Sequence, residues 1–496
     1  MTHDELAEQL AEFDRDPKQA MNKLPPKKER GGKERQQVPT LFAAESRQDN
    51  SFVEQRDRYR KLLNMERDGQ LVRLGQVQPG RAPFQDNDRA EDLVDGPAGE
   101  FVRTLEEIEK RELLSAELTE GPWSDWYWPI YQGILGARYN DKEFPLGSQD
   151  WKEKYDYVVR NPASAFVGRG ADAVNQLSPS EKYDLLIGDA EGHLTQAMWD
   201  EGERYYDQSG KVELWMGICH GWSPAAYMLP RPAAAIQVLA ADGRTMITFY
   251  PSDLKALGSL VWAKGAPSVR FIGGRCNDKK PATDENGRVV SQQCFDTNPG
   301  TFHLALVNQL GLRERSFILD ATFDYEVWNQ PIYSYSYTYF NPQTRKPVGT
   351  LAEAKVARSA FPGDRFAKYR SAKATHLVGI GLELSYVAET MPSSDPSDTQ
   401  TNDYQRVVNY TYDLELDASG RILGGEWHTN AHPDFLWTPP PGAMASATTD
   451  YAATGGWEDG AVPPTWRRAA IAAARNGQPL GKLVAALFAR SHAKQG

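Results

Sequence analysis

The chain has 496 residues, of which 40% are hydrophobic, so it can bury a large core and is long enough for roughly three average domains. Its formal net charge of −11 at pH 7 argues against a nucleic-acid-binding role. No stretch of the sequence approaches the roughly 18 consecutive apolar residues of a membrane-spanning helix.

Residues 1–95 predict a flexible N-terminal arm or a pro-segment, because they are polar and weakly periodic. Within them, the run from Lys23 to Lys33 combines prolines, glycines and mixed charges, which is typical of a solvated linker. A basic docking patch is the alternative interpretation of this run. The first ten residues lack a basic segment followed by an apolar one, so no secretory leader is visible and the localisation stays open.

Residues 96–210 predict a mainly helical region that packs on the core. The charge-rich segment from Phe101 to Leu118 is helical in pattern, and Ser178-Pro179-Ser180-Glu181 is typical of a helix start, with helix continuing to about Asp207. Between them, Trp123–Pro129 holds an aromatic cluster. Such a cluster favours core or inter-domain packing, with ligand stacking as the alternative.

Residues 211–440 predict the catalytic core, because short strands and turns replace the helical pattern. Three antiparallel hairpins are expected: Ala234–Leu239 with Thr245–Tyr250, Phe302–Asn308 with Ser316–Leu319, and Tyr410–Leu416 with Ile422–Trp427. Helical segments followed by antiparallel strands favour an α+β fold. Residues 441–496 predict a C-terminal extension with short helices at Trp466–Arg475 and Leu480–Arg490.

The chain has three cysteines, so at least one has no partner within the chain. Cys276 and Cys294 flank a polar, turn-rich stretch, where a loop-closing disulfide is expected. Three reduced thiols are the alternative. The disulfide would leave Cys219 as the free thiol.

Cys219 follows an apolar turn and precedes small residues, a pattern that predicts a thiol in the first turn of a buried helix. The positive end of that helix would stabilise a thiolate, and its N–H groups would hold a developing oxyanion. An inert buried cysteine is the alternative. Trp215 and Trp222 flank the thiol and are expected either to line the site and exclude water or to pack in the core.

A nucleophilic cysteine needs a base, and His303 is the candidate, oriented by Asp320 across the second predicted hairpin. The order Cys219, His303, Asp320 is that of papain-like thiol enzymes. The neighbouring His220 is a poor candidate, because adjacent side chains on a helix point about 100° apart. A second constellation runs from His428 to Asp434, where a structural polar turn is favoured over a metal site.

Several strings in the sequence resemble the transglutaminase elicitor family of oomycetes and bacteria. The strings are Trp123–Pro129, Cys219–Ala225, Asp253–Leu257, Gly274–Asn277, Asp296–His303, Val327–Pro331, Gly424–Trp427 and Asn430–Trp437. In the family, the Val327–Pro331 string begins a surface peptide that plants perceive. Here the similarity ends after Pro331, and Ile332–Tyr337 replaces the family's basic continuation.

The resemblance implies protein-glutamine γ-glutamyltransferase activity, calcium dependence, a papain-like thiol-protease fold and a secreted protein. The implied partners are a protein glutamine donor and a lysine or primary amine acceptor, joined through a Cys219 thioester. If water replaces the amine, the enzyme is a glutamine deamidase. The same residues would also suit a papain-like cysteine protease, and a surface-recognition protein with a degenerate site is the non-enzymatic interpretation. Calcium is expected at Asn277-Asp278 with Asp284–Gly287, where a solvated acidic turn is the alternative.

Overall fold

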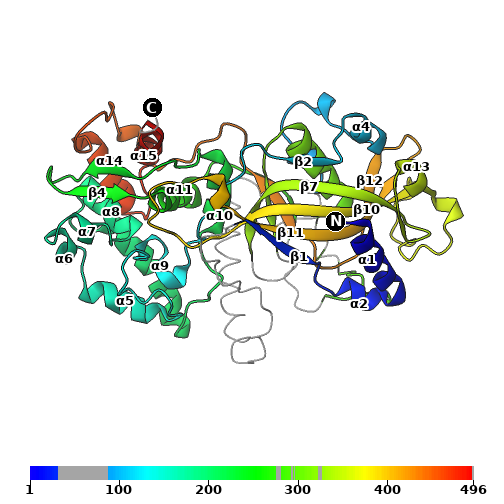
Figure 1. Ribbon diagram of the computed structural model, residues 1–496, viewed down its shortest axis with the longest axis horizontal. Coiled ribbons are helices and arrows are strands. Elements are labelled where there is room, and N and C mark those ends of the chain that lie inside the picture. The colour runs from blue at the N-terminus through cyan, green and yellow to red at the C-terminus, as the bar shows by residue number, and fades with distance from the viewer. Residues whose placement is uncertain (32–87, 275–280, 292–293, 295–296, 322–326, 494–496) are drawn as a thin grey trace, which may run out of the picture.

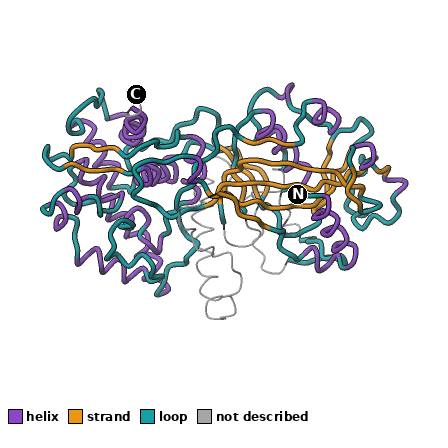
Figure 2. Tube along the Cα trace, in the orientation of Figure 1, coloured by secondary structure: helices purple, strands orange, loops and turns teal. Residues whose placement is uncertain are grey.

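The structure, a computed structural model, describes residues 1–31, 88–274, 281–291, 294, 297–321 and 327–493. Figures 1 and 2 show an elongated molecule made of two lobes. Helices crowd the left lobe in this view, and the long strands lie in the right lobe. We call them the helical lobe (residues 123–266 and 441–493) and the sheet lobe (the described residues of 1–31, 88–118 and 270–438). Helix α10 (Cys219–Met228) lies where the two lobes meet (Figure 1).

The helical lobe has one hydrophobic core, rich in tryptophan and leucine. Its helices besides α10 are α5 (Trp151–Arg160), α6 (Ser164–Val167), α7 (Ala171–Val174), α8 (Pro179–Ile187), α9 (His193–Ser209), α11 (Pro251–Gly265), α14 (Pro464–Ala474) and α15 (Gly481–Ala493). A two-stranded sheet, β3 (Ile236–Leu239) with β4 (Met246–Phe249), packs among them. No helix in the described ranges has both the length and the apolar composition needed to cross a membrane.

The sheet lobe is built on one antiparallel sheet, which has eleven strands among the described residues. Three of them, β7, β10 and β11, are thirteen residues long and lie side by side at its centre. The strands are β1 (Lys27–Gly31), β2 (Ser115–Glu117), β5 (Arg270–Gly273), β6 (Ile318–Asp320), β7 (Asn329–Asn341), β8 (Lys346–Val348), β9 (Val356–Ala357), β10 (His376–Ala388), β11 (Tyr404–Leu416), β12 (Ile422–Trp427) and β13 (Phe435–Thr438).

Helices cover the sheet and enclose a second core, which is rich in leucine, isoleucine and tyrosine. They are α1 (His3–Arg15), α2 (Pro17–Met21), α4 (Leu105–Lys110), α12 (Pro299–Ala305), α13 (Leu351–Ala354) and a π-helix at Leu306–Leu312. The combination of a helical lobe and an antiparallel sheet agrees with the α+β class expected from the sequence.

Much of the N-terminal arm is ordered where the structure describes it. The linker expected at Lys23–Lys33 instead contains β1, which pairs with the first half of β11. Helix α1 packs on the sheet lobe through Leu6 and Leu10, which contact Phe340. Residues 1–31 are therefore part of the sheet lobe, and residues 32–87 lie outside the described ranges.

Two of the three predicted hairpins form. Leu239 pairs with Met246 in the first, and Leu416 pairs with Ile422 in the last. The predicted helix start at Ser178 is also confirmed, because its side chain and that of Glu181 form a reciprocal capping box. Both predicted C-terminal helices form as α14 and α15 and pack in the helical lobe.

The predicted hairpin at Phe302–Asn308 is wrong, because this segment is helical. Asn298 caps the helix by accepting a hydrogen bond from the N–H of Gly300, and Pro299 occupies the first helical position. Both residues favour a helix start, and this local signal outweighs the apolar alternation of the residues that follow. His303 therefore lies on helix α12 rather than on a strand. The helix expected from Phe101 to Leu118 is shorter than predicted, because only α4 and a short strand form there.

A buried ion pair ties the segment around Arg370 to the sheet. The guanidinium donates a 2.9 Å hydrogen bond to the Asp413 carboxylate on β11, and His428 contacts the same carboxylate at 3.2 Å. Burial alone would raise the pKa of Asp413, but the charge and hydrogen bonds of Arg370 outweigh it and hold the pKa well below its usual range. Phe13 of α1 stacks on His428 at 4.6 Å, so the N-terminal helix rests on this pair.

We expect Asp413→Asn to lower the free energy of unfolding by about 2 kcal/mol at pH 7, because it removes one of the two carboxylates that hydrogen-bond to the buried Arg370 guanidinium and leaves only Asp364. The depressed pKa means that Asp413 stabilises the fold above about pH 4 and that this contribution is lost as the pH falls. The difference between variant and wild type should therefore shrink below about pH 4. Urea unfolding at several pH values measures this difference in the free energy of unfolding. Asp156→Asn, which breaks an exposed pair with Lys152, should cost less than about 0.5 kcal/mol. An equally small loss for Asp413→Asn would contradict the expectation.

Candidate functional site

Cys219 is the first residue of α10, as the sequence predicts. The helix begins directly after an isolated β-bridge between Gly217 and Pro129, and the N–H of Ile218 donates to the Tyr127 carbonyl at 2.8 Å. Gly221 lets α10 lie directly on α11, because a Cβ atom at this position would meet the Ser259 carbonyl oxygen at 2.2 Å. This close approach fixes the start of α10 and therefore the depth of the thiol.

The start of strand β7 faces the Cys219 thiol from the sheet lobe. The thiol lies 3.7 Å from the Val327 carbonyl oxygen, to which its S–H donates. The Nδ2 amide of Asn329 donates to the sulfur at 3.6 Å. The indole of Trp437 on β13 in turn donates a 2.8 Å hydrogen bond to the Oδ1 atom of Asn329. The thiol therefore has an acceptor for its protonated form and a donor for its ionised form.

The environment of Cys219 keeps the thiol protonated near neutral pH. The residue is 6% exposed, and burial raises the pKa of the thiol to about 11. The negative charges of Glu389 and Asp320 act in the same direction, while hydrogen bonds from the backbone and side chain of Asn329 act in the opposite direction. Burial dominates, so the helix end does not by itself produce a standing thiolate.

Asp320 lies near enough to Cys219 for its negative charge to raise the pKa of the thiol. It pairs directly with Asn329 where β6 and β7 run side by side, and its Oδ1 atom accepts a 3.0 Å hydrogen bond from the N–H of Trp328. Glu389 follows β10 and accepts a 2.5 Å hydrogen bond from the Gln330 side chain. Two buried carboxylates thus share the region of the thiol.

The structure does not bring His303 to Cys219. Its Nδ1 atom lies 2.9 Å from the Tyr412 hydroxyl, and its ring packs 4.8 Å from that of Tyr337. Tyr337 is eight residues along β7 from Asn329, which is about 26 Å at a rise of ~3.3 Å per residue. Burial lowers the pKa of His303 to about 3, so the ring is neutral inside the sheet lobe.

The histidines of the second constellation are structural. His428 bonds to Asp413 and stacks on aromatic rings, while His432 stacks on Trp427 at 4.8 Å. His220 is an exposed residue of α10. All eight histidines of the chain lie in the described ranges, and none of their rings forms a hydrogen bond with the Cys219 thiol. The His428–Asp434 segment is therefore a structural polar turn.

The two tryptophans near the thiol differ in their placement. Trp222 is fully buried, and its indole donates to the Trp123 carbonyl at 3.2 Å, so it packs in the core. Trp215 is only partly buried, and its indole donates to the Glu213 carboxylate. The aromatic cluster at Trp123–Pro129 is also buried, which confirms packing as its role.

The structure describes only one of the two cysteines of the predicted disulfide. Cys294 is buried and disulfide-bonded, and Cys276 lies outside the described residues. Cys219 has a free thiol.

The described part of the expected calcium site does not fit a calcium ion. Asp284 accepts hydrogen bonds from the N–H groups of Asn286 and Arg288 and from the Tyr369 hydroxyl, so its oxygens are already engaged. Glu285 pairs with Lys368. Asn277 and Asp278 lie outside the described residues. No cluster of three or more His, Cys, Asp or Glu that could hold a metal is found among the residues that the structure describes. Calcium dependence stays a prediction, which activity in a chelator measures.

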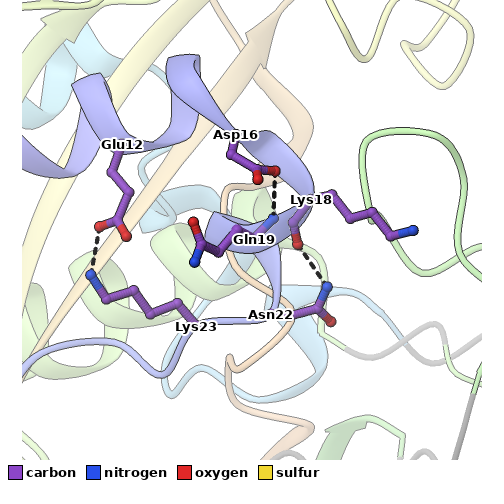
Figure 3. A pocket seen from close by; sticks show the side chains of 6 residues that line it. All are labelled: Glu12, Asp16, Lys18, Gln19, Asn22 and Lys23. Carbon is purple, nitrogen blue, oxygen red and sulfur yellow. Dashed lines mark hydrogen bonds and ion pairs between the residues drawn. The ribbon is translucent and has the colours of Figure 1, made fainter.

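A surface hollow of about 730 Å³ lies at the N-terminal helices, away from the thiol (Figure 3). Its lining residues are Glu12, Asp16, Lys18, Gln19, Asn22 and Lys23. Their polar groups bond to one another, as in the 2.6 Å pair of Lys23 with Glu12. The hollow therefore offers no reactive group, and Cys219 remains the candidate site.

Sequence reasoning missed Asn329, Trp437 and Glu389. Asn329 and Trp437 lie in strings that resemble the transglutaminase elicitors, but neither residue type suggests a partner for a thiol. Glu389 had no local signal, because its proximity to Cys219 depends on how β10 lies in the sheet.

Comparisons with known proteins identify the family and the fold of the chain. A family model described as transglutaminase elicitor matches residues 100–454, which include every residue around the thiol. The crystal structure of the GP42 transglutaminase from Phytophthora sojae has a similar fold, with a TM-score of 0.51 and 22% sequence identity. The match covers 79% of this chain and 94% of that one. No curated protein matches the chain.

We expect the rate of Cys219 alkylation by iodoacetamide to rise with pH and to show no plateau below about pH 10, because the thiol pKa is about 11. Glu389→Gln removes a negative charge near the sulfur, so it should lower that pKa and speed alkylation at pH 8 by about threefold or more. Mass spectrometry of the modified peptide measures the rate. Glu426→Gln, which removes a buried carboxylate paired with Arg288, is the control and should leave it unchanged. A wild-type plateau near pH 8 would contradict the expectation.

Proposed function

We propose that this chain, which belongs to the transglutaminase elicitor family, is a protein-glutamine γ-glutamyltransferase that works through a thioester on Cys219. One observation carries the proposal most strongly: a free thiol at the start of a helix, at the junction of two lobes, meets an amide N–H and a carbonyl of the facing strand. An inert core cysteine does not require polar partners of both kinds.

In the first step, the Cys219 sulfur attacks the γ-carboxamide of a protein glutamine. The carbon–sulfur bond forms, the carbon–nitrogen bond breaks, and ammonia leaves. The positive end of α10, where no side chain caps the helix, stabilises the negative charge that develops on the attacked carbonyl. The Asn329 amide stabilises the sulfur as it gives up its proton.

We assign the role of proton acceptor to Asp320 instead of His303. The pKa of the thiol is far above that of a carboxylic acid, so a free thiolate is rare and the proton leaves as the carbon–sulfur bond forms. Of these two residues, Asp320 is the one that lies beside Asn329, whose amide touches the sulfur. The same carboxyl group then passes the proton to the departing ammonia.

In the second step, a lysine or another primary amine attacks the thioester. The amine loses a proton to the Asp320 carboxylate, the isopeptide bond forms as the carbon–sulfur bond breaks, and Asp320 returns the proton to the Cys219 sulfur. The low exposure of Cys219 favours an amine delivered by a docked partner over bulk water. Attack by water would make the same site a glutamine deamidase.

Incorporation of a labelled primary amine into a glutamine-containing protein tests the proposal. Cys219→Ala should reduce incorporation by about a thousandfold or more, because it removes the nucleophile. Cleavage of the test protein without incorporation would indicate a papain-like protease. Intact wild-type protein that incorporates no amine, tested with and without calcium, would reject transglutamination.

Two further variants separate the proposed proton acceptors. Asp320→Asn should lower the rate of amine incorporation by about a hundredfold or more. His303→Gln should change it by less than about threefold, because His303 packs on Tyr337, which lies about 26 Å along β7 from Asn329. Circular dichroism confirms that both variants fold. A loss for His303→Gln as large as that for Cys219→Ala would restore the Cys219–His303–Asp320 triad.

A further inference from the structure

The hydrogen bond between Trp437 and Asn329 determines which atom of the Asn329 amide faces the thiol. An indole N–H is only a donor, so the amide atom that meets it at 2.8 Å must be the oxygen. The amide NH2 group is therefore directed at the Cys219 sulfur, 3.6 Å away. With the amide reversed, an oxygen would face the sulfur and oppose its ionisation.

The sheet explains why a side chain as long as tryptophan is needed here. Strands β13 and β7 are not neighbours, because β6 lies between them and pairs with both. Trp437 is opposite Ile318 of β6, which is opposite Pro331 of β7, so the indole and the Asn329 side chain must together span two strand spacings, about 10 Å. The ring packs with Ile318 and Phe435 and is 8% exposed. A rigid, buried donor thus holds the amide in one orientation.

We propose that Trp437 is a positioning residue of the thiol site, which acts through the Asn329 amide to stabilise the ionising sulfur of Cys219. The proposal rests on the proposed function for its catalytic meaning, since it names a further part of the same machinery. Its physical content is independent of the reaction, because it concerns the ionisation of the thiol. The alternative role of Trp437 is packing alone.

Trp437→Phe separates the two roles, because it keeps most of the buried ring and removes the N–H. If Trp437 positions the amide, alkylation of Cys219 at pH 8 should slow by about tenfold. This is the effect expected when a charged atom loses one hydrogen bond. The alkylation pH profile should shift upward by about one unit. Amine incorporation should lose a similar factor in kcat with little change in KM.

Trp427→Phe is the matched control. Trp427 is also buried, and its indole donates a 2.9 Å hydrogen bond to the Thr297 carbonyl instead of to Asn329. The pH profile of Cys219 alkylation in Trp427→Phe should equal that of the wild type. If both variants slow alkylation equally, or if Trp437→Phe lowers only the unfolding temperature, Trp437 is a packing residue and the proposal is overturned.

Asn329 variants complete the test and cover the case in which Trp437→Phe fails to fold. Asn329→Asp keeps an oxygen for the indole and replaces the amide donor with a second oxygen, so it should slow alkylation by more than tenfold. Asn329→Ala should slow it about tenfold, and adding Trp437→Phe to it should have no further effect, because the two act through one hydrogen bond. Additive losses, or an unchanged rate for Asn329→Asp, would overturn the proposal. A wild type that incorporates no amine, with slowed alkylation in these variants, would reject the proposed function and leave the positioning role intact.

Discussion

The contact between the first turn of α10 and the start of β7 is the constraint on which the site depends. The helix belongs to one lobe and the strand to the other, so the thiol lies at the junction of two cores. Gly221 holds the helix against α11, and the pairing of β7 with β6 holds Asn329 at the sulfur. A shift of either element by one residue would turn the amide away from the thiol.

This contact also determines whether the thiol is ionised, because the interactions that favour the thiolate and those that favour the thiol differ in strength. The positive end of α10 and the Asn329 hydrogen bonds favour the thiolate. Burial and the charges of Glu389 and Asp320 favour the thiol, and together they are stronger. The Cys219 thiol is therefore held in its protonated form, which protects it from oxidation and stray alkylation.

Local patterns predicted the elements whose signals lie within a few residues. The capping box at Ser178, the turn between β3 and β4, and the helix that begins at Cys219 all formed as expected. The segment around His303 shows the limit of predicting structure from local sequence patterns. Its apolar residues suit a strand as well as a buried helix, and the cap at Asn298 with Pro299 decided for the helix. Placing the histidine on a strand then suggested a triad that the sheet does not assemble.

The sequence alone thus determined that Cys219 begins a helix, because a helix start is a local feature, and it determined the α+β class, because helical and strand periodicities occupy separate regions. The partners of the thiol were decided only by the tertiary structure. Asp320, Asn329, Glu389 and Trp437 come from four segments, and the order and register of β6, β7, β10 and β13 bring them together. Strand register is a property of the whole sheet, so no spacing along the chain encodes which histidine, carboxylate or amide will face the sulfur.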